Sequence, residues 1–483
     1  MNRREKLRLL QAAEGYFRSG NHALARMTLD SLVAADASSS RAFELLGYIH
    51  ASAGDLAEAN RCLDKACRLP GVAPEAFYYL GASYLKLGDA QSAIEAFDRS
   101  MALAGPFFEA LHDRGTAWSM LGRSAAALES YTKALQLRPR SFDLLFNIGK
   151  VHDQRRDLAQ AIAFYDRALD LDPGVADVWA HKGAALYDAE RYGEAIEHWQ
   201  RALAIDPRIE FLPGFVLHAR LRLCDWRGWE ADRATLLERV RQGDNACGPF
   251  EMLALSSDES LQLRSAEHWV AALPPLRLPA ARFERAARDK LRIAYFSADF
   301  GRHPVSYLTA ELFERHDRDA FEVHAFALKG AAADDEMRAR LVRAFDHFVE
   351  VEQLGDLEIV ERARQLGIDI AIDLGGHTKG SRTALFKERV APVQVNYLGY
   401  PGTMGADFVD YLVADDTIVP ESAWPGYSER VVHLPDCFQP CDTSRPIPDS
   451  PPDRVAHGLP GQGFVFCSFN NTYKFNPEVF GLW

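Results

Sequence analysis

The chain has 483 residues, of which 48% are apolar and 25% charged, and its formal net charge at pH 7 is −13. The length allows several domains of roughly 150 residues each. The negative charge argues against nucleic acid as the main partner, and no apolar run is long enough to span a bilayer. Residues 1–6 are basic, but no signal-peptide core follows them, so we expect a cytoplasmic protein that does not bind membranes.

The seven cysteines are few for this length, and their number is odd. Cys437 and Cys441 are close in sequence, with His433 nearby, but no second pair of ligands follows at a matching spacing. The sequence therefore predicts reduced cysteines and no metal site.

A glycine recurs every thirty-four residues in the first half of the chain, and Ala13 holds the same phase one period earlier. The glycines are Gly47, Gly81, Gly115, Gly149 and Gly183. Twelve residues after each comes an alanine, in the series Ala25, Ala59, Ala93, Ala127, Ala161 and Ala195. A bulky residue follows in the series Leu29, Leu63, Phe97, Tyr131, Tyr165 and Trp199. A fixed period of this length is typical of a stacked solenoid.

The segment Tyr79 to Tyr84, followed by Ala93 to Phe97, fits the tetratricopeptide repeat pattern. Each unit is expected to be two antiparallel helices, which approach closely at the small residues while the bulky residues fill the space beside them. Six units fit, at 7–40, 41–74, 75–108, 109–142, 143–176 and 177–210. The sequence predicts an α-solenoid over residues 1–210, with a groove for an extended peptide or a partner protein. Alternatively, the groove only supports the domain behind it.

The repeat pattern ends after Glu210, and a helical connector is expected over residues 211–288. Helical patterns cover 215–222 and 231–241, and the sequence Cys224-Asp225-Trp226 lies between them. Pro274, Pro275 and Pro279 mark a turn-rich stretch before the next domain.

From residue 289 onward, short apolar runs alternate with helical patterns. Strands are expected at 291–297, 321–328, 368–374, 393–398, 411–414 and 431–434, and helices at 307–315, 335–345, 357–366 and 382–388. This alternation predicts a Rossmann-like, doubly wound and mostly parallel sheet over residues 289–457. Ligands of such sheets bind at the carboxyl ends of the strands, so the loops there carry the candidate site.

The first two loops after strands contain histidines. In residues 297–304, Gly301 allows a turn, and His303 can take a proton near neutral pH, although it can equally be a surface histidine. In residues 373–380, paired glycines precede His377, Thr378 and Lys379. This second loop is either a phosphate-binding loop or a tight strand-to-helix turn.

Two later loops are unusual in composition. Residues 399–405 hold three glycines and a proline, which predicts a rigid loop with unusual backbone angles. Residues 464–468 are expected to form a strand that leads into an Asn-rich turn. Lys474 then precedes a helix capped by Asn476 and Pro477. A lysine beside a helix N-terminus suits a phosphate, or it is simply solvated.

The repeats and the four loops together resemble a known family. Tetratricopeptide repeats followed in order by D-F-G-x-H-P, G-G-H-T-K-G, L-G-Y-P-G-T-x-G and F-N-x-x-Y-K resemble the nucleocytoplasmic O-linked N-acetylglucosamine transferases. The Cys224-Asp225-Trp226 motif is also similar, and the lack of a long insertion between the lobes resembles bacterial members. The resemblance covers essentially the whole chain.

The resemblance implies a GT-B glycosyltransferase, with a first lobe at 289–457 and the start of a second, nucleotide-binding lobe at 458–483. It implies an inverting, metal-independent enzyme without a cofactor. This enzyme would transfer N-acetylglucosamine from UDP-N-acetylglucosamine to Ser or Thr hydroxyls of proteins.

The resemblance also implies roles for individual residues. His303 matches the family's active-site histidine, Lys474 matches the lysine that stabilises the diphosphate, and Asn471 replaces a donor-contacting glutamine. The segment that lines the sugar pocket matches Leu398, Pro401, Gly402 and Thr403.

The chain departs from the animal enzymes at several positions. Their second active-site histidine aligns with Asp369, and His377 stands where they carry a tyrosine. Their solenoid has an asparagine ladder that grips peptide backbone, whereas the matching positions here are Leu45, Tyr79, Asp113, Asn147 and His181. Substrate capture by that ladder is therefore not expected.

The chain stops at Trp483, early in the second lobe. A partly built lobe buries its apolar faces poorly, so residues 464–483 are expected to be exposed and the chain to bind UDP-sugar weakly or not at all. Micromolar binding in a calorimetric titration with UDP would contradict this. Two other functions remain open: transfer of another sugar such as fucose, and a non-catalytic repeat scaffold. Competition among sugar nucleotides separates the first from the expected activity.

Overall fold

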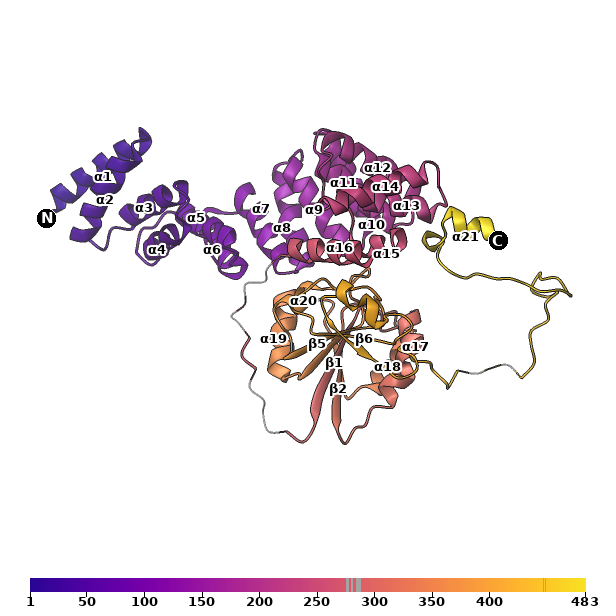
Figure 1. Cartoon of the computed structure of the whole chain (residues 1–483). Helices are drawn as coiled ribbons and strands as arrows, with labels where there is room; N and C mark the ends of the chain where they lie inside the picture. Colours follow the sequence, from indigo (N-terminus) through magenta and orange to yellow (C-terminus); the bar gives the residue numbers. More distant parts are fainter. Residues whose placement is uncertain (275–277, 279–280, 284–287, 446, 448) are drawn as a thin grey trace. The chain divides into compact units, whose positions relative to one another are not determined.

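The computed structural model describes residues 1–274, 278, 281–283, 288–445, 447 and 449–483, and the chain divides into two units, 1–185 and 186–483 (Figure 1). The boundary falls inside helix α11 (Ala176–Asp188). Of the turn-rich stretch predicted before the sheet, Pro275 and Pro279 lie outside the described residues. No helix within the described ranges is long and apolar enough to cross a membrane.

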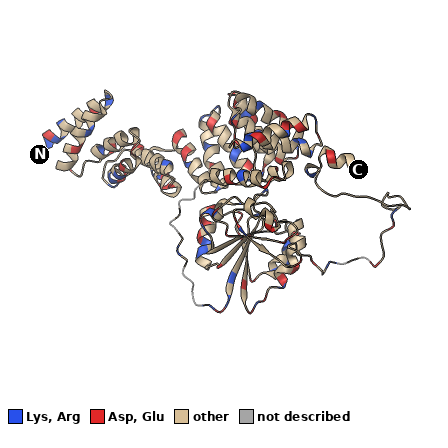
Figure 2. Cartoon of the chain, viewed as in Figure 1, with Lys and Arg blue, Asp and Glu red and all other residues tan. Residues whose placement is uncertain are grey.

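Helices of 12 to 16 residues fill the predicted repeats two at a time. Before α11 they are α1 (Arg3–Arg18), α2 (His22–Ala35), α3 (Ser40–Ser52), α4 (Leu56–Cys67), α5 (Pro74–Leu87), α6 (Ala90–Ala104), α7 (Phe108–Met120), α8 (Ser124–Leu137), α9 (Phe142–Gln154) and α10 (Leu158–Leu169). The sixth pair is α11 with α12 (Tyr192–Ile205). Lysines, arginines and acidic residues are interspersed along these helices (Figure 2). The predicted tetratricopeptide architecture is therefore confirmed.

The glycine ladder lies directly against the ladder of bulky residues. A Cβ atom added at Gly115 would lie 2.5 Å from the Tyr131 ring, and one added at Gly149 would lie 2.6 Å from the Tyr165 ring. Such distances are shorter than real Cβ contacts, so only glycine allows each helix pair to approach this closely. The expected packing of small against large residues is confirmed.

The connector contains more helix than the sequence predicted. The two expected helices are α13 (Leu212–Arg222) and α14 (Trp229–Arg241), and α15 (Pro249–Leu255) and α16 (Glu259–Ala272) follow them. Leu217, Trp229 and Met252 belong to one buried cluster that joins α13, α14 and α15. The connector therefore has a hydrophobic core of its own.

The seven strands form one parallel sheet in the order β3-β2-β1-β4-β5-β6-β7 (Figure 1). They are β1 (Leu291–Ser297), β2 (Phe321–Ala327), β3 (His347–Glu350), β4 (Ile370–Asp373), β5 (Val393–Tyr397), β6 (Tyr411–Ala414) and β7 (Arg430–His433). The doubly wound sheet is confirmed. The sequence missed β3, because its four residues are partly exposed and lack a buried apolar run.

Apolar cores lie on both faces of the sheet. Phe296 and Phe326 stack in one of them with ring centroids 4.5 Å apart, and Tyr295 packs against Phe313 in the other. The helices of this region are α17 (Pro304–Glu314), α18 (Glu336–Ala344), α19 (Asp356–Leu366) and α20 (Ala384–Lys387), with a 3-10 helix η1 (Glu421–Gly426). Burial on both faces explains the continuous apolar runs of β1 and β2.

The strand expected at 464–468 does not form. Phe464 and Phe466 are 82% and 90% exposed, and residues 464–468 pair with no strand among the described residues. A strand needs a partner for its backbone groups and a covered apolar face, and this segment has neither. The following turn is a 3-10 helix, η2 (Thr472–Lys474), and α21 (Pro477–Leu482) begins at the expected cap, where the Asn476 side chain accepts a hydrogen bond from Val479 N.

Candidate active site

The strand order reverses direction between β1 and β4, which is where a doubly wound sheet forms a ligand crevice. The loops that leave the carboxyl ends of these two strands touch each other there. A Cβ atom added at Gly380 would lie 3.1 Å from the Cβ of Ala298. The first and second predicted loops are therefore neighbours at one edge of the sheet.

His303 lies in the first loop and caps helix α17. Its Nδ1 accepts a hydrogen bond from the backbone N–H of Val305 at 3.3 Å and lies 3.5 Å from the Asp299 carboxylate. The side chain is 45% exposed, so a ligand can reach it. Burial raises the pKa of Asp299, while nearby His303 lowers it. The arrangement is an accessible imidazole beside a carboxylate, which is suited to proton transfer.

The third loop has the unusual backbone that its composition predicts. Leu398 has a φ of +74°, in the left-handed region that side chains rarely adopt. At Gly399 an added Cβ would lie 2.0 Å from the backbone oxygen of Leu374, so no side chain fits there. The loops after β4 and β5 are thus in backbone contact.

Hydrogen bonds from the third loop to the buried Glu429 carboxylate fix the conformation of the loop. Thr403 is 2% exposed, and its hydroxyl donates to the buried Glu429 carboxylate at 2.7 Å. The backbone N–H of Met404 donates to the same carboxylate at 2.6 Å, and burial raises the pKa of Glu429. Pro401 is exposed, and Gly402 is buried against the Tyr400 ring. Of the three residues in the Pro-Gly-Thr turn, only Pro401 is open to solvent.

His377 is buried at the base of the second loop. Its Nε2 donates to the backbone oxygen of Met404 at 2.9 Å, and its ring meets Tyr400 edge-on with centroids 5.1 Å apart. Burial lowers the pKa of His377 to about 4, so the ring is neutral at pH 7. These contacts make His377 a positioning residue that ties the second loop to the third.

Asp369, which the resemblance aligned with a second active-site histidine, lies at the opposite edge of the sheet. It comes just before β4, and its carboxylate accepts a hydrogen bond from the backbone N–H of Arg292 at 2.8 Å. Four residues of strand span roughly 13 Å, which separates Asp369 from the carboxyl end of β4. The structure therefore separates Asp369 from the other predicted residues, which follow the carboxyl ends of the strands.

Asp373 ends β4 at the carboxyl edge, and the sequence analysis did not single it out. It is 3% exposed, and its carboxylate accepts a hydrogen bond from Gly375 N at 2.9 Å. Burial raises its pKa to about 6. The signal in the sequence was an acidic residue at the end of an apolar strand, directly before paired glycines.

The segment with Asn471 and Lys474 packs on the connector. The Asn471 side-chain oxygen accepts from Arg222 at 3.3 Å, and the Thr472 hydroxyl donates to the backbone oxygen of Arg222 at 2.7 Å. The Tyr473 ring lies 4.4 Å from the Arg222 guanidinium. Lys474 is exposed, and nothing in the described part of the chain brings it into contact with His303.

His218 is a second residue that the sequence analysis missed. It is 1% exposed on α13, its Nδ1 lies 3.0 Å from the Tyr187 hydroxyl, and its ring centroid is 4.8 Å from that of Tyr473. Burial, and secondarily Arg222, lower its pKa to about 3. The only signal available was a histidine one helical turn before Arg222.

An ion pair joins the His218 cluster to the carboxyl edge of the sheet. Lys379, in the second loop, pairs at 2.7 Å with Asp188, the residue next to Tyr187. Helix α11 therefore contacts the loop after β4 through Asp188 and connector helix α13 through Tyr187. His218 and Arg222 both contact Tyr473, the residue before Lys474.

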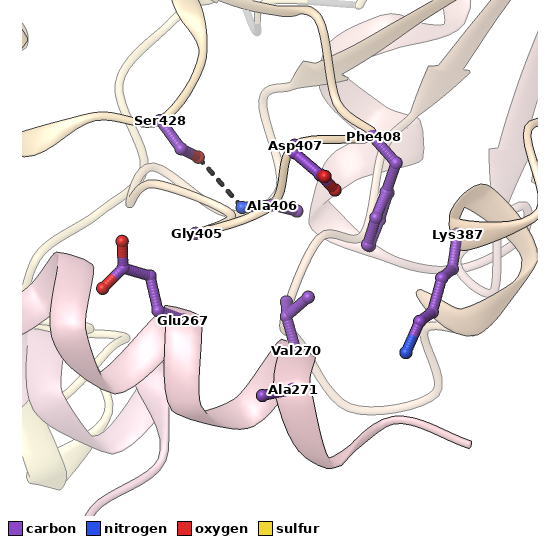
Figure 3. A pocket seen from close by; sticks show the side chains of 9 residues that line it. All are labelled: Glu267, Val270, Ala271, Lys387, Gly405, Ala406, Asp407, Phe408 and Ser428. Carbon is purple, nitrogen blue, oxygen red and sulfur yellow. Dashed lines mark hydrogen bonds between the residues drawn. The ribbon is translucent and has the colours of Figure 1, made fainter. Parts of the chain in front are cut away.

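A hollow lies between α16 and the segments that precede β5, β6 and β7. Its volume is about 680 Å³, and none of the predicted site residues lines it. Figure 3 shows the side chains of Glu267 and Val270 from α16 on one side and the segment of Ala406 to Phe408 on the other. Lys387, which also lines the hollow, donates to the backbone oxygen of Leu273 at 3.0 Å.

Comparison with known families agrees with these features. Residues 270–449 match glycosyl transferase family 41. Tetratricopeptide repeats match at 10–68, 53–105 and 119–176, and a further repeat matches at 176–209. The two matched regions correspond to the helix pairs and to the parallel sheet.

Two curated relatives are peptide N-acetylglucosaminyltransferases by name. The probable UDP-N-acetylglucosamine–peptide N-acetylglucosaminyltransferase SEC of Arabidopsis thaliana is 34% identical over 289 residues, which cover 56% of this chain and 30% of that protein. The enzyme of Caenorhabditis elegans is 38% identical over 160 residues, which cover 33% of this chain and 14% of that protein. The chain thus spans less than a third of the length of these relatives.

A solved structure of an O-GlcNAc transferase mutant from Thermobaculum terrenum is 26% identical, with a TM-score of 0.48, and the match covers 78% of this chain and 65% of that one. The order of the motifs, the repeats and the family 41 segment carry the assignment. Residues 270–449 thus carry a glycosyl transferase family 41 segment behind tetratricopeptide repeats, and the chain is similar to O-GlcNAc transferases.

Proposed function

We propose that this protein transfers N-acetylglucosamine from UDP-N-acetylglucosamine to Ser or Thr hydroxyls of acceptor proteins. The observation that carries the proposal is the accessible His303, which lies beside Asp299 where the sheet reverses its strand order, within the family 41 segment. Relatives that share this segment are named peptide N-acetylglucosaminyltransferases.

In the proposed reaction, the acceptor hydroxyl oxygen attacks the anomeric carbon of the sugar and the bond from that carbon to the UDP oxygen breaks. The hydroxyl proton passes to His303, whose positive charge Asp299 then balances. Attack from the face opposite the leaving group inverts the anomeric centre. UDP leaves with the electron pair of the broken bond.

The leaving diphosphate needs positive charge close to it. Lys474 belongs to the segment that packs on the connector, and Arg222 ends connector helix α13, where its guanidinium donates to the Asn471 side chain. We propose that these side chains bind the diphosphate, so that the transfer itself requires neither a metal ion nor a cofactor. Leu398, with its left-handed backbone, and exposed Pro401 would then border the sugar.

The acceptor protein is proposed to bind along the repeat groove. The positions that correspond to an asparagine ladder differ in character here. Leu45 is buried, Tyr79 is 45% exposed, and Asn147 contacts His112 through its side-chain amide at 3.3 Å. Such a surface favours mixed apolar and polar contacts with an acceptor over a repeated grip on its backbone.

The test is a transfer assay on a library of Ser- and Thr-containing peptides. The full chain is supplied with UDP-N-acetylglucosamine or GDP-fucose at millimolar concentration, so that weak binding does not hide transfer. We expect N-acetylglucosamine on the peptides by mass spectrometry, and a loss of about 10²- to 10⁴-fold in rate for His303→Ala. His457→Ala, an exposed histidine elsewhere, is the matched control.

Three outcomes would contradict the proposal. Faster transfer from GDP-fucose than from UDP-N-acetylglucosamine would show that the donor is not the proposed one. Peptide binding without any transfer would leave a repeat scaffold as the function. An unchanged rate in His303→Ala would remove that residue from the chemistry.

A further inference from the structure

Three side chains that can bind a metal meet at the amino end of the sheet, away from the candidate active site. Glu322 and His324 lie two residues apart on β2, so they point to the same face. His347 begins β3 and pairs in register with His324. The parallel register therefore brings Glu322, His324 and His347 to one place.

The three potential ligand atoms are at distances that suit one ion. Glu322 Oε1 lies 3.1 Å from His324 Nε2 and 3.1 Å from His347 Nε2. All three atoms lie within 4.8 Å of one another. A tetrahedral ion with bonds of about 2.0–2.1 Å holds its ligands roughly 3.3 Å apart, so small side-chain adjustments are sufficient.

The surroundings orient these groups. The rings of His324 and His347 stack with centroids 4.6 Å apart and planes 27° from parallel, and their Nε2 atoms both face the Glu322 carboxylate. Arg292 pairs with the other carboxylate oxygen at 3.0 Å and so fixes the carboxylate.

One ligand is buried and another is open to solvent. His324 is 1% exposed, and its Nδ1 has no hydrogen-bond partner among the described residues. The His347 side chain is 54% exposed, which leaves an entry path and room for water as a further ligand. This is the one cluster of three such groups found in the described part of the chain.

We propose that Glu322, His324 and His347 bind a divalent transition-metal ion of the Zn²⁺ type. Two imidazoles and one carboxylate are ligands that such ions prefer. The ion would join the edge strand β3 to β2. Because the site lies at the amino ends of these strands, it is a structural site and independent of the proposed transfer reaction.

The test is calorimetric titration of the full chain with Zn²⁺ after treatment with a chelator. Cys437, Cys441 and Cys467 are free and exposed, and thiols are ligands that Zn²⁺ accepts, so the parent for this experiment carries serine at these three positions. We expect one equivalent of Zn²⁺ per chain. His347→Ala should weaken binding by at least about 10- to 100-fold, and His457→Ala should not change it.

A second measurement separates metal binding from misfolding. His347 is exposed, so His347→Ala should keep the far-UV circular dichroism spectrum of the parent. Zn²⁺ should raise the melting temperature of the parent but not that of His347→Ala or Glu322→Gln. The proposal is overturned if the parent binds no Zn²⁺, because the three side chains are then only a hydrogen-bonded cluster. It is also overturned if His347→Ala and Glu322→Gln bind Zn²⁺ with the affinity of the parent.

Discussion

At the scale of single residues, burial separates chemistry from positioning within the same loops. His303 and His377 both follow strands at the carboxyl edge, but only His303 is accessible. His377 is 8% exposed and is hydrogen-bonded to the backbone oxygen of Met404. The Thr403 hydroxyl donates a hydrogen bond to the Glu429 carboxylate. These buried groups shape the loops, and His303 is the residue that can meet a substrate.

The buried His377 should make stability depend on pH. Its pKa falls from 6.5 to about 4 on folding, so the unfolded chain binds the proton more readily between these values. Stability is therefore lost as the pH falls from 6.5 towards 4, by up to about 1.4 kcal/mol per pH unit. His377→Gln keeps a donor for the Met404 oxygen and removes the titration.

The check is the difference in melting temperature between pH 7 and pH 5, measured for the parent and for His377→Gln. We expect a smaller drop in the variant. Other groups titrate in both proteins and cancel in this comparison. An equal drop would show that His377 does not contribute.

At the scale of elements, the helix pairs from α3–α4 to α9–α10 each have one glycine that faces one bulky residue. At Gly115 an added Cβ would lie 2.5 Å from the ring of Tyr131, which is 1% exposed and cannot move aside. At Gly15, also inside a helix, an added Cβ would meet nothing within 4 Å. The repeat glycines are thus required by packing rather than by backbone conformation.

Gly115→Ala should therefore destabilise the solenoid by about 1–3 kcal/mol, because overpacking outweighs the better helix propensity of alanine. Gly15→Ala is the matched control and should be neutral or stabilising by up to about 1 kcal/mol. Thermal unfolding followed by circular dichroism measures both. Equal melting temperatures for the two variants would contradict the packing argument.

At the scale of the whole molecule, the connector receives a segment from the far end of the chain. Tyr473 packs among Arg222, His218 and Phe250, and Phe480 lies 5.2 Å from Trp226 between ring centroids. These contacts hold residues 471–483 although the preceding stretch is exposed. The expectation that residues 464–483 would be exposed holds for Phe464, Phe466 and Phe469 but not for Tyr473.

Tyr473→Ala should loosen this docking by about 1–2 kcal/mol, since it removes a cation–π contact and two ring contacts. That free-energy change corresponds to a roughly 5- to 30-fold larger fraction of molecules in which residues 471–483 are undocked. Limited proteolysis with mass spectrometry should show faster cleavage after residue 470. Phe469→Ala is the control, because Phe469 is 95% exposed. Unchanged cleavage in Tyr473→Ala would show that the docking does not protect the segment.

Prediction from the sequence succeeded where the pattern is local or repeated. The glycine ladder, the buried strands and the cap at Asn476 each depend on neighbours in sequence or on one period. It failed for β3, which is too short and exposed to show a pattern, and for 464–468, whose apolar residues find no partner strand. The position of Asp369 at the amino end of β4 could not be predicted, because an aligned position does not say at which end of a strand a side chain lies.

Local sequence patterns are enough to predict the repeat solenoid, the doubly wound sheet and the loops that carry His303, His377 and the Pro-Gly-Thr turn. These features follow from periodicity and composition. Three features emerge only from the folded chain: the burial of particular polar groups, the contact of His218 with Tyr473, and the cluster of Glu322, His324 and His347. Those contacts join residues far apart in sequence, and strand register and helix packing set them rather than any local pattern.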